Sequence, residues 1–593
     1  MIFGKHINRY YLKYAPHLLL GLLALWTVDY LQLIIPELYQ MVINGMNQGY
    51  VMVDGVQHVF DMEFLLDKIC MPMLIVVVTI VFGRFLWRVS IFGAAVKVET
   101  DLRDQMFDHA KNLSREYYQV NKVGNLMSLF TNDLDTVQEC YGWGFMQFFD
   151  ALILGVLSMS KMWRMNHMLT VLSLIPMALL FASATLVGRV MTKKWDYRQE
   201  CFSNLSDFSQ ESFSGIAVIK AFVKEAKELM AFKKLNDENE VANIDFTKTS
   251  VLMRIMVGSF VESVMCIILG YGGYLVHKGT FNAGQLMEFI GYFTAIVWPI
   301  MAVSELIDMT SRGKASLKRI SELLDAEITV KDRPNVKELE HVKGDIEFRD
   351  LTFRYPDGEF NELEHISFQI HSGESIGLVG KTGSGKTTLV DLILRTYNVP
   401  DGTIFIDGRD VNSVSIHSVR ANCAYVPQDN LLFSDTIARN IAFGEKKVNL
   451  SEVKHAAILA DVDENITQFQ EGYETVLGER GVTVSGGQKQ RISIARALMK
   501  DAPILILDDS VSAVDTKTER AILENLRQTR KNKTTILIAH RISTIEQMDK
   551  VLFIDEGKIS GFGTHEKLYE ENAAYRKMVD LQRLEEEGGK VNA

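Results

Sequence analysis

The sequence contains few cysteines and no excess of positive charge. Its five cysteines are scattered, with no Cys-x-x-Cys pair and no metal-site spacing, which predicts free thiols. The net charge of −11 argues against a nucleic-acid-binding surface. Apolar runs long enough to cross a bilayer are missing from the second half of the chain, but several occur in the first half. We therefore expect a membrane domain followed by a soluble domain.

The first part of the chain is predicted to cross the membrane six times. Its first apolar run, Leu18 to Ile35, is too long for the core of a cleavable signal peptide, and no small-residue cleavage site follows it. Six apolar segments have the length of a bilayer-spanning helix. These predicted spans are Ala15–Met41, Ile69–Ala95, Val137–Lys161, His167–Val187, Ser250–Val276 and Gln285–Met309.

Lysine and arginine are distributed unevenly between the segments that connect these spans. Met46–Asp67 contains neither residue, whereas Val96–Asp135 and Gly188–Thr249 contain many. Positively charged connections tend to stay on the cytoplasmic side of a membrane. We therefore expect a multi-pass plasma-membrane protein with both termini and the soluble domain in the cytoplasm.

The two cytoplasmic segments contain no proline, and their apolar residues recur at helical spacing. We expect the spans to continue into the cytoplasm as helices of about 20 residues, roughly 30 Å long. Gly124 and Gly215 are the predicted turns of the two helical hairpins. The hairpin tips would contact the soluble domain; the alternative is that these are ordinary surface helices.

Several ionisable residues fall inside the predicted spans, where they are costly in lipid. Asp29 and Glu262 lie nearest to mid-membrane. They are candidates for contact with a cationic substrate, and the alternative is a structural pairing with another helix. The methionines that are abundant in this half suit either an adaptable cavity or simple apolar filling. Other ionisable residues inside the spans include Arg84, Arg88, Glu288 and Glu305.

A phosphate loop is the strongest motif of the second half. It follows the apolar strand Ser375–Val379 and opens a helix at Thr388–Leu394, as this motif requires. Its backbone N–H groups are expected to bind ATP phosphates, with Lys386 on the β- and γ-phosphates and Thr387 on Mg²⁺. The predicted nucleotide-binding residues of the loop are Gly380, Thr382, Gly383, Ser384, Gly385, Lys386, Thr387 and Thr388.

Two adjacent carboxylates, Asp508 and Asp509, follow a second apolar strand, Ile504–Leu507. Downstream of a phosphate loop, the first carboxylate is expected to hold Mg²⁺. The second position carries the base that activates water, usually a glutamate. Because aspartate is one methylene shorter, Asp509 predicts a site that binds ATP well and hydrolyses it slowly.

These motifs resemble those of the ATP-binding cassette (ABC) family. Ser485-Gly486-Gly487-Gln488-Lys489-Gln490-Arg491 is similar to the family's signature segment, and Thr475–Gly481 resembles a segment specific to its exporters. Further similarities in family order are Tyr355, Gln428, Ser512–Asp515, His540, Asp101-Leu102-Arg103, Gly284 and Trp298-Pro299-Ile300. The resemblance is to bacterial half-transporters and implies an all-α six-helix transmembrane domain fused to an α/β P-loop nucleotide-binding domain.

The resemblance also implies roles for the matching residues. Tyr355 would stack on adenine, Gln428 would sense Mg²⁺ and the γ-phosphate, and His540 would hold the γ-phosphate and the attacking water. The signature residues Ser485, Gly486, Gly487 and Gln488 would complete the ATP site of an opposing subunit. The implied cofactors are ATP and Mg²⁺. The expected divisions are residues 1–325 for the membrane domain, 326–344 for a linker, 345–582 for the nucleotide-binding domain and 583–593 for a flexible tail.

Asp509 combined with an intact signature resembles one half of the heterodimeric multidrug exporters. A partner chain bearing glutamate would then supply the faster site, and the pair would move amphipathic drugs or lipids outward by alternating access. One alternative is that Asp509 works in a tolerant active site. Two others are a regulatory ATP-binding subunit that does not hydrolyse, and a homodimeric lipid or peptide exporter.

Overall fold

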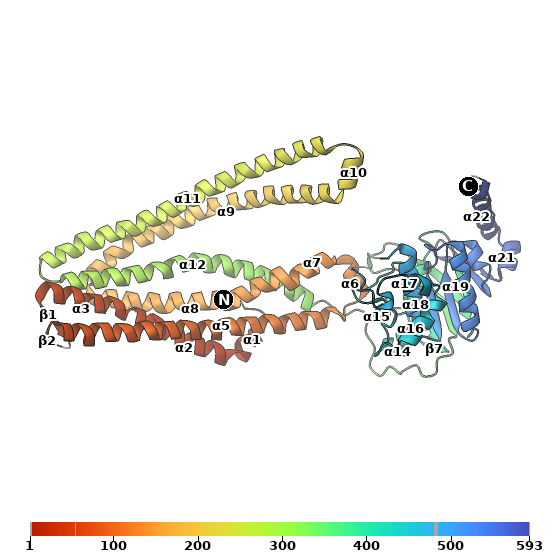
Figure 1. The fold of residues 1–593 in the computed structure, drawn as a ribbon, viewed down its shortest axis with the longest axis horizontal. Helices are drawn as coiled ribbons and strands as arrows, with labels where there is room; N and C mark the ends of the chain where they lie inside the picture. The colour runs from red at the N-terminus through yellow and green to blue at the C-terminus, as the bar shows by residue number, and fades with distance from the viewer. Residues whose placement is uncertain (1–2, 54, 479–483, 592–593) are drawn as a thin grey trace. The chain divides into compact units, whose positions relative to one another are not determined.

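The computed structural model describes residues 3–53, 55–478 and 484–591. The chain folds into two compact units (Figure 1). The first unit consists of Met1–Asp108 and Gly124–Asp325, and the second consists of His109–Val123 and Ala326–Ala593. The short segment His109–Val123 therefore belongs to the second unit, although the sequence placed it within a continuous membrane domain.

The first unit is almost entirely helical. Asn166 and Asn282 accept hydrogen bonds from Leu169 N and Gln285 N, and so fix the starts of two of its long helices. Its helices are α1 (Asn8–Lys13), α2 (Ala15–Gln32), α3 (Ile34–Gln48), α4 (Met62–Phe64), α5 (Met71–Ala110), α7 (Val123–Ser128), α8 (Leu134–Met165), α9 (His167–Ser214), α10 (Ile216–Ala221), α11 (Glu225–His277) and α12 (Ala283–Leu324), with π-helical turns at Leu65–Cys70 and Leu129–Asp133 and a hairpin of β1 (Tyr50–Val53) and β2 (Val56–Val59).

Five helical stretches of the described residues are long and apolar enough to cross a membrane. They are Ala15–Gln48, Met62–Ala110, Val123–Met165, Glu225–His277 and Ala283–Leu324, and a shorter apolar stretch, His167–Leu180, begins α9. All six predicted spans lie within these helices. The first span is interrupted at Leu33, between α2 and α3. Pro36 accounts for this break, because proline has no N–H to donate to the carbonyl of Gln32.

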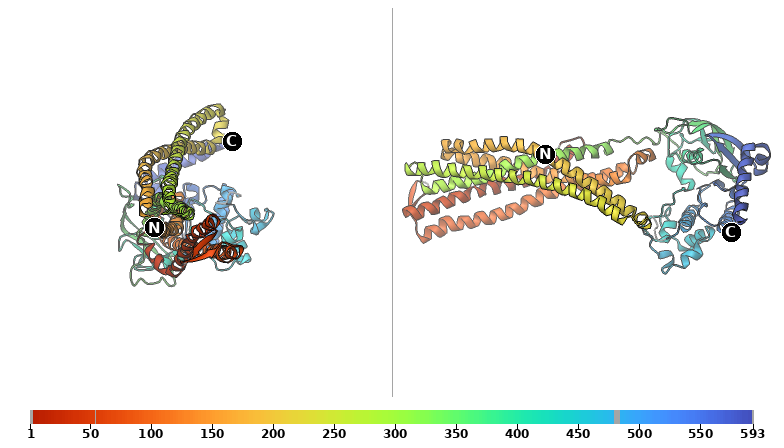
Figure 2. Two further views of the ribbon diagram at one scale, coloured as in Figure 1. Left: turned by 90° about the vertical axis from the view of Figure 1, so that its left-hand side faces the viewer. Right: turned by 90° about the horizontal axis from the view of Figure 1, so that it is seen from above.

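The helices α9 and α11 lie side by side and are joined by the short helix α10 (Figures 1 and 2). The chain turns at Gly215, where the sequence predicted a turn, and the Gly215 N–H closes the last turn of α9 on Glu211 O at 2.8 Å. The other predicted turn, Gly124, is misplaced, because this residue lies inside α7. Extended backbone at Ser114 and Asn121 makes that turn instead, on either side of α6 (Arg115–Val120).

The second unit contains two sheets and their covering helices. Its six-stranded sheet has the order β12-β11-β5-β10-β9-β8, and its four-stranded sheet the order β4-β3-β6-β7. The strands are β3 (Ile346–Phe353), β4 (Leu363–Ile370), β5 (Ser375–Val379), β6 (Ile404–Ile406), β7 (Arg409–Asp410), β8 (Cys423–Val426), β9 (Ile504–Asp508), β10 (Thr534–Ile538), β11 (Lys550–Asp555) and β12 (Lys558–Gly563). Helices cover one face of the parallel part, and the four-stranded sheet together with a helix covers the other. Its strands β9 and β10 are therefore buried along their whole length.

The helices of the second unit complete this α/β architecture. They are α6, α13 (Lys386–Ile393), α14 (Ile416–Ala421), α15 (Ile437–Ile441), α16 (Leu450–Leu459), α17 (Asp463–Thr467), α18 (Gly486–Met499), α19 (Thr516–Thr529), α20 (Ile542–Ile545), α21 (His565–Glu571) and α22 (Ala573–Val591). The helix α22 extends past residue 583, where the tail was predicted to begin, and Arg583 pairs with Glu546 at 2.7 Å.

Candidate nucleotide-binding site

Strand register brings the separate motifs of the second unit to one edge of the parallel sheet. Ile538 of β10 pairs with Leu378 of β5 on one side and with Asp508 of β9 on the other, and Leu507 pairs with Val426 of β8. The carboxyl ends of parallel strands meet at the same edge, where α/β proteins bind ligands. The residues that follow these strands are the phosphate loop, His540, Asp509 and Gln428.

The phosphate loop is shaped by glycines that leave no room for a side chain. A Cβ at Gly380 would lie 2.1 Å from Ile554 O, and one at Gly385 would lie 2.6 Å from Leu363 Cδ2. Gly385 also has a positive φ of 93°. Thr382 and Gly383 are exposed at the loop tip, whereas Ser384, Lys386 and Thr388 are buried and Thr387 is half-buried. The helix α13 begins at Lys386, two residues earlier than predicted.

Lys386 is a buried cation whose carboxylate neighbours are not bonded to it. Its Nζ donates to Gly380 O at 2.9 Å and to Lys381 O at 2.8 Å. Burial lowers the pKa of Lys386, and Asp508 and Asp509 partly oppose this shift. A buried ammonium whose partners are two carbonyls and the Ser384 hydroxyl, all uncharged, favours an anionic ligand, and the γ- and β-phosphates have the required charge.

The Asp508 carboxylate fits a Mg²⁺ site. The side chain is 1% exposed, its Oδ1 accepts from Thr387 Oγ1 at 3.3 Å, and its buried Oδ2 has no hydrogen-bond partner within the described residues. Burial raises the pKa of Asp508. A hydroxyl and a carboxylate at this spacing, beside a phosphate loop, are the protein ligands that Mg²⁺ takes together with phosphate oxygens. The residues present therefore fit Mg²⁺ and ATP.

Asp509 is held in place by its backbone on two sides. Its N–H donates to Ile538 O at 3.0 Å, and its carbonyl accepts from Ser512 Oγ at 2.9 Å and Gln490 Nε2 at 3.4 Å. Its φ of 46° is in the left-handed region, which is uncommon for a residue with a side chain. The backbone that carries the Asp509 side chain is thus constrained on both sides.

Three further predicted site residues surround this edge. The side chains of Gln428 and His540 are exposed beside it. Tyr355 is half-buried, its hydroxyl is 2.7 Å from Thr388 Oγ1, and its ring packs edge-on against Tyr397 with centroids 5.1 Å apart. Burial raises the pKa of Tyr355 to about 12, so its hydroxyl is neutral at physiological pH. Tyr355 therefore lies next to the phosphate loop, beside the start of α13.

The signature segment forms the exposed start of α18. Ser485 caps the helix, with Gln488 N donating to Ser485 Oγ at 3.3 Å and Ser485 N donating to Gln488 Oε1 at 2.9 Å. Ser485 and Gly486 are exposed, and Gly487 lies against Ala513, whose carbonyl would be 3.1 Å from an added Cβ. Within the described residues no hydrogen bond joins this segment to the phosphate loop of the same chain. Residues 479–483, part of the predicted exporter segment, lie outside the described residues.

Sequence reasoning missed an ion pair beside the phosphate loop. Arg115 of α6 donates from Nη1 to both carboxylate oxygens of Asp391 in α13, each at 2.8 Å. The Asp391 side chain is only 5% exposed, and its burial raises its pKa, which the Arg115 cation opposes. Thr329 Oγ1 also donates to Glu116 Oε2 at 3.0 Å. The basic character of Arg115 was visible, but nothing in the sequence indicated its distant partner.

The ionisable residues of the membrane unit have separate partners. Tyr292 donates to Glu288 at 2.8 Å and to Glu37 at 3.0 Å, and Lys161 pairs with Glu37. Glu262 is exposed. No hydrogen bond or ion pair of the described residues joins Glu262 to Asp29, so the two candidates nearest to mid-membrane do not form one site within this chain.

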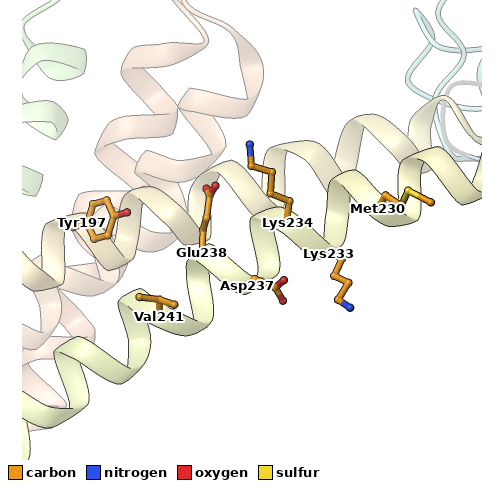
Figure 3. Close-up of a pocket in the computed structure, with 7 residues that line it drawn as sticks. All are labelled: Tyr197, Met230, Lys233, Lys234, Asp237, Glu238 and Val241. Carbon is orange, nitrogen blue, oxygen red and sulfur yellow. The ribbon is translucent and has the colours of Figure 1, made fainter.

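The groove between α9 and α11 does not resemble a nucleotide site. It has a volume of about 500 Å³ and is lined by residues of both helices (Figure 3). It lies away from the apolar start of α9 and from the apolar end of α11. Its charged residues cancel in sign, and it contains none of the predicted site residues. The lining residues are Tyr197, Met230, Lys233, Lys234, Asp237, Glu238 and Val241.

Comparisons with known proteins agree with the two-part organisation. Residues 18–300 match the sequence model of the ABC transporter transmembrane region, and residues 363–512 match that of the ABC transporter family. The chain is 34% identical over 589 residues to a probable multidrug resistance ABC transporter ATP-binding/permease protein, YheI of Bacillus subtilis (strain 168), covering 99% of this chain and 98% of the relative. It is 33% identical over 568 residues to the multidrug resistance-like ATP-binding protein MdlA of Escherichia coli (strain K12), covering 95% and 94%.

A solved structure shares the fold over nearly the whole length. It is the structure of a bacterial Atm1-family ABC exporter with ATP bound, with a TM-score of 0.77 and 24% identity, covering 97% of this chain and 98% of that one. The predicted fold class, helical spans fused to a nucleotide-binding domain with sheets, is confirmed by this likeness and by the family matches.

Proposed function

Since this chain belongs to the ABC transporter family and carries a membrane region and an ATPase domain in one polypeptide, we propose that it is the slow-site subunit of a heterodimeric multidrug exporter. Its own phosphate loop, Asp508 and Asp509 would form the slower ATP site. Its Ser485–Gln488 signature would complete the faster site, whose catalytic glutamate comes from a partner chain.

The observation that carries this proposal is the fixed backbone of Asp509. Aspartate places its carboxylate about 1.5 Å further back than glutamate, one carbon–carbon bond. A misplacement of about 1 Å can cost roughly 10²-fold in rate, and a general base contributes roughly 10²–10⁴-fold. The backbone hydrogen bonds of Asp509 to Ile538, Ser512 and Gln490 oppose a forward shift that would compensate. Water activation at this site is therefore slow.

The intact signature supports the assignment of a second, faster site. Ser485 and Gly486 are exposed at the start of a 14-residue helix, with the helix N-terminus available to an anion. Gln490 of the same helix binds the backbone of both Asp509 and Ala513, at 3.4 and 3.0 Å. The helix whose start would face the partner's nucleotide is thereby hydrogen-bonded to the backbone of this chain's own Asp509.

The residues of the chain's own site have distinct tasks. Gly380 and Gly385 shape the loop so that backbone N–H groups converge on the phosphates, and Lys386 neutralises them. Thr387 and Asp508 would hold Mg²⁺, with Gln428 beside them, while His540 would orient water and Tyr355 would carry the adenine. Bound Mg²⁺ supplies positive charge to the phosphate oxygens on which negative charge develops.

Two features support transmission between the nucleotide site and the membrane helices. The helix α5 runs into His109–Val123, where α6 is fastened to the phosphate-loop helix by Arg115 and Asp391. The turn around α10 has no partner within the described residues and exposes large apolar side chains, a pattern typical of a protein-binding surface. We assign the turn around α10 to contact with the partner chain. Its exposed residues are Phe213, Ile216, Val218, Phe222 and Val223.

The proposed direction of transport and the proposed cargo are supported by the distribution of positive charge and by the names of the relatives. Cytoplasmic termini and nucleotide domains are supported by the lysine- and arginine-rich connections. Both relatives carry multidrug resistance in their names. We therefore propose that ATP binding closes the paired nucleotide domains, opens the membrane helices outward, and releases an amphipathic compound outside the plasma membrane.

Kinetics of the co-purified pair test the proposed division of labour. Replacing the partner's catalytic glutamate by glutamine should lower ATP turnover at least about 100-fold, whereas Asp509→Asn should lower it less than about threefold. Ser485→Arg should damage turnover as severely as the partner's substitution. Ser451→Arg, at an exposed serine near the start of α16, is the matched control.

The alternatives give different results in the same experiment. Equal losses from both carboxylate substitutions would exclude an asymmetric pair. Purification of the chain as a functional pair with itself would favour the homodimeric exporter. A chain that gains no turnover from Asp509→Glu would favour the regulatory subunit.

A further inference from the structure

Two carboxyl groups meet in the middle of the membrane unit, where the sequence indicated only one. Asp29 of α2 is 2% exposed, and its Oδ2 is buried without a hydrogen-bond partner among the described residues. The Asp150 carboxyl of α8 lies within hydrogen-bonding reach of it and is half-buried. An acid of this kind is costly at membrane depth and marks a functional site.

Two other helices add polar groups to this pair. Trp298 of α12 donates its Nε1–H to Asp150 Oδ2 at 2.8 Å. The Arg84 guanidinium of α5 attracts both carboxyls electrostatically and donates a hydrogen bond to Gln32 at 3.5 Å. The neighbouring Gly83 lets α5 approach α2 closely, because a Cβ there would lie 2.6 Å from Val28 Cγ2.

These four side chains share one depth in the membrane. Asp29, Arg84, Asp150 and Trp298 each lie within two residues of the middle of a predicted span. Four helices thus direct polar groups to one level of the bilayer. Asp150 is half-buried and Trp298 is 41% exposed, so one side of the cluster is accessible from the surface of the subunit.

The charges of the cluster indicate which kind of ligand it would bind. Two carboxyl groups at hydrogen-bonding distance in a low dielectric cannot both ionise, so they hold one proton between them. With that proton, one carboxylate balances the Arg84 guanidinium. Without it, the cluster carries one uncompensated negative charge. The charged groups of the described residues that act on Asp29 are Asp150 and Arg84, so no other cation of the chain supplies the balance.

We propose that Asp29 and Asp150 form a binding site for the cationic group of a transported organic cation, which displaces their shared proton. The bound cation replaces the positive charge of the shared proton, so the cluster stays neutral. The displaced proton passes to water. Trp298 offers an aromatic surface beside the site, and its N–H keeps Asp150 oriented. The role of this site in export rests on the proposed function; its exchange of a proton for a cation does not.

Equilibrium binding to the full-length chain in lipid nanodiscs tests the exchange. The probe is radiolabelled tetraphenylphosphonium, a permanent organic cation, measured between pH 5 and pH 9. Release of one proton for each cation bound predicts an affinity that rises by up to about tenfold per pH unit. Asp29→Asn and Asp150→Asn should each remove this slope and weaken binding at least about tenfold at high pH.

A matched control and a chemical readout accompany these variants. Glu305→Gln changes another acid of the spans, one that accepts from Gln147 at 2.7 Å, and should keep the slope. Dicyclohexylcarbodiimide modifies protonated carboxyl groups in apolar surroundings. Tetraphenylphosphonium should protect Asp29 and Asp150 of the wild-type chain from it, as measured by mass spectrometry. This second readout applies even if a variant does not fold.

The outcomes separate this inference from the proposed function. A wild-type affinity that is independent of pH, or a slope that survives both aspartate substitutions, would overturn the inference. Carbodiimide labelling of Asp29 and Asp150 that tetraphenylphosphonium does not reduce would do the same. ATP-driven transport of the neutral ester calcein acetoxymethyl ester tests the export proposal by itself. If that transport is absent while the slope persists, the export proposal fails and the cation site stands.

Discussion

Removal of the Arg115 side chain would separate nucleotide binding from its effect on the membrane helices. Arg115→Ala leaves the Asp391 carboxylate, which is 5% exposed, without its cation. Breaking a buried ion pair costs about 3–5 kcal/mol. Because the Arg115 side chain is itself 48% exposed, solvent screening reduces this penalty, and we take about 2 kcal/mol for the docking of α6. That corresponds to about a 30-fold weaker docking equilibrium.

Hydrogen exchange and ATPase assays measure this change separately. Amides in 115–120 should exchange about 30-fold faster in Arg115→Ala, since local opening sets their protection. Stimulation of ATP turnover by a transported drug should be lost while basal turnover is kept, because Lys386, Asp508 and Asp509 are unchanged. Arg115→Lys should recover part of the protection, since a single Arg115 nitrogen makes both bonds to Asp391.

Arg333→Ala is the matched control for this prediction. Arg333 also bonds both oxygens of an aspartate in the same unit, Asp401 at 3.0 and 2.7 Å, but both side chains are more than half exposed. Such a pair contributes about 0–1 kcal/mol. If Arg115→Ala changed the exchange of 115–120 no more than Arg333→Ala does, the assignment of Arg115 to transmission would be refuted.

Three further predictions concern the nucleotide site. Asp509→Glu should raise single-turnover hydrolysis at the chain's own site by about 10²-fold, since it restores the missing reach; a rate within threefold of wild type would count against the steric argument. Asp508→Asn should stabilise the nucleotide-free protein at pH 7 by about 1–3 kcal/mol and abolish stabilisation by Mg²⁺ with ATP, as measured by thermal unfolding. The sign follows from the raised pKa of Asp508: its contribution to stability is present at low pH and is lost as the pH rises through the folded-state pKa. Gly385→Ala should cost about 1–3 kcal/mol and weaken ATP binding, because of its φ of 93° and its contact with Leu363; Gly402→Ala, with a φ of 73° in open space, is the control and should leave ATP binding unchanged.

The sequence predicted the nucleotide site more fully than the membrane unit. The phosphate loop, Asp508 and the signature segment are local patterns, so their strand and helix context could be inferred from neighbouring residues. Their meeting at one edge also follows from the rule that parallel strands end together. What could not be inferred was the backbone restraint on Asp509, because Gln490 and Ser512 reach it only after the chain folds.

The membrane unit was harder to predict because its polar contacts are made between helices distant in sequence. Asp29 was recognised as a buried acid, but its neighbour Asp150 was overlooked inside an aromatic and apolar stretch. Glu262, which was grouped with Asp29, is exposed instead. Gly124 was taken for a turn, whereas Ser114 and Asn121 provide it with extended backbone that does not require glycine. Hydropathy predicts which segments span the membrane, but it does not predict which faces of these helices pack against one another.

The most direct test of the slow-site assignment is the lifetime of ATP in each pocket of the purified pair. A photoreactive, doubly radiolabelled ATP analogue is trapped in both sites, the chains are separated, and the decay of the triphosphate is followed on each. The account predicts that the triphosphate crosslinked near Lys386 persists at least about 100-fold longer than that in the partner's pocket. Equal decay in the two pockets would contradict it.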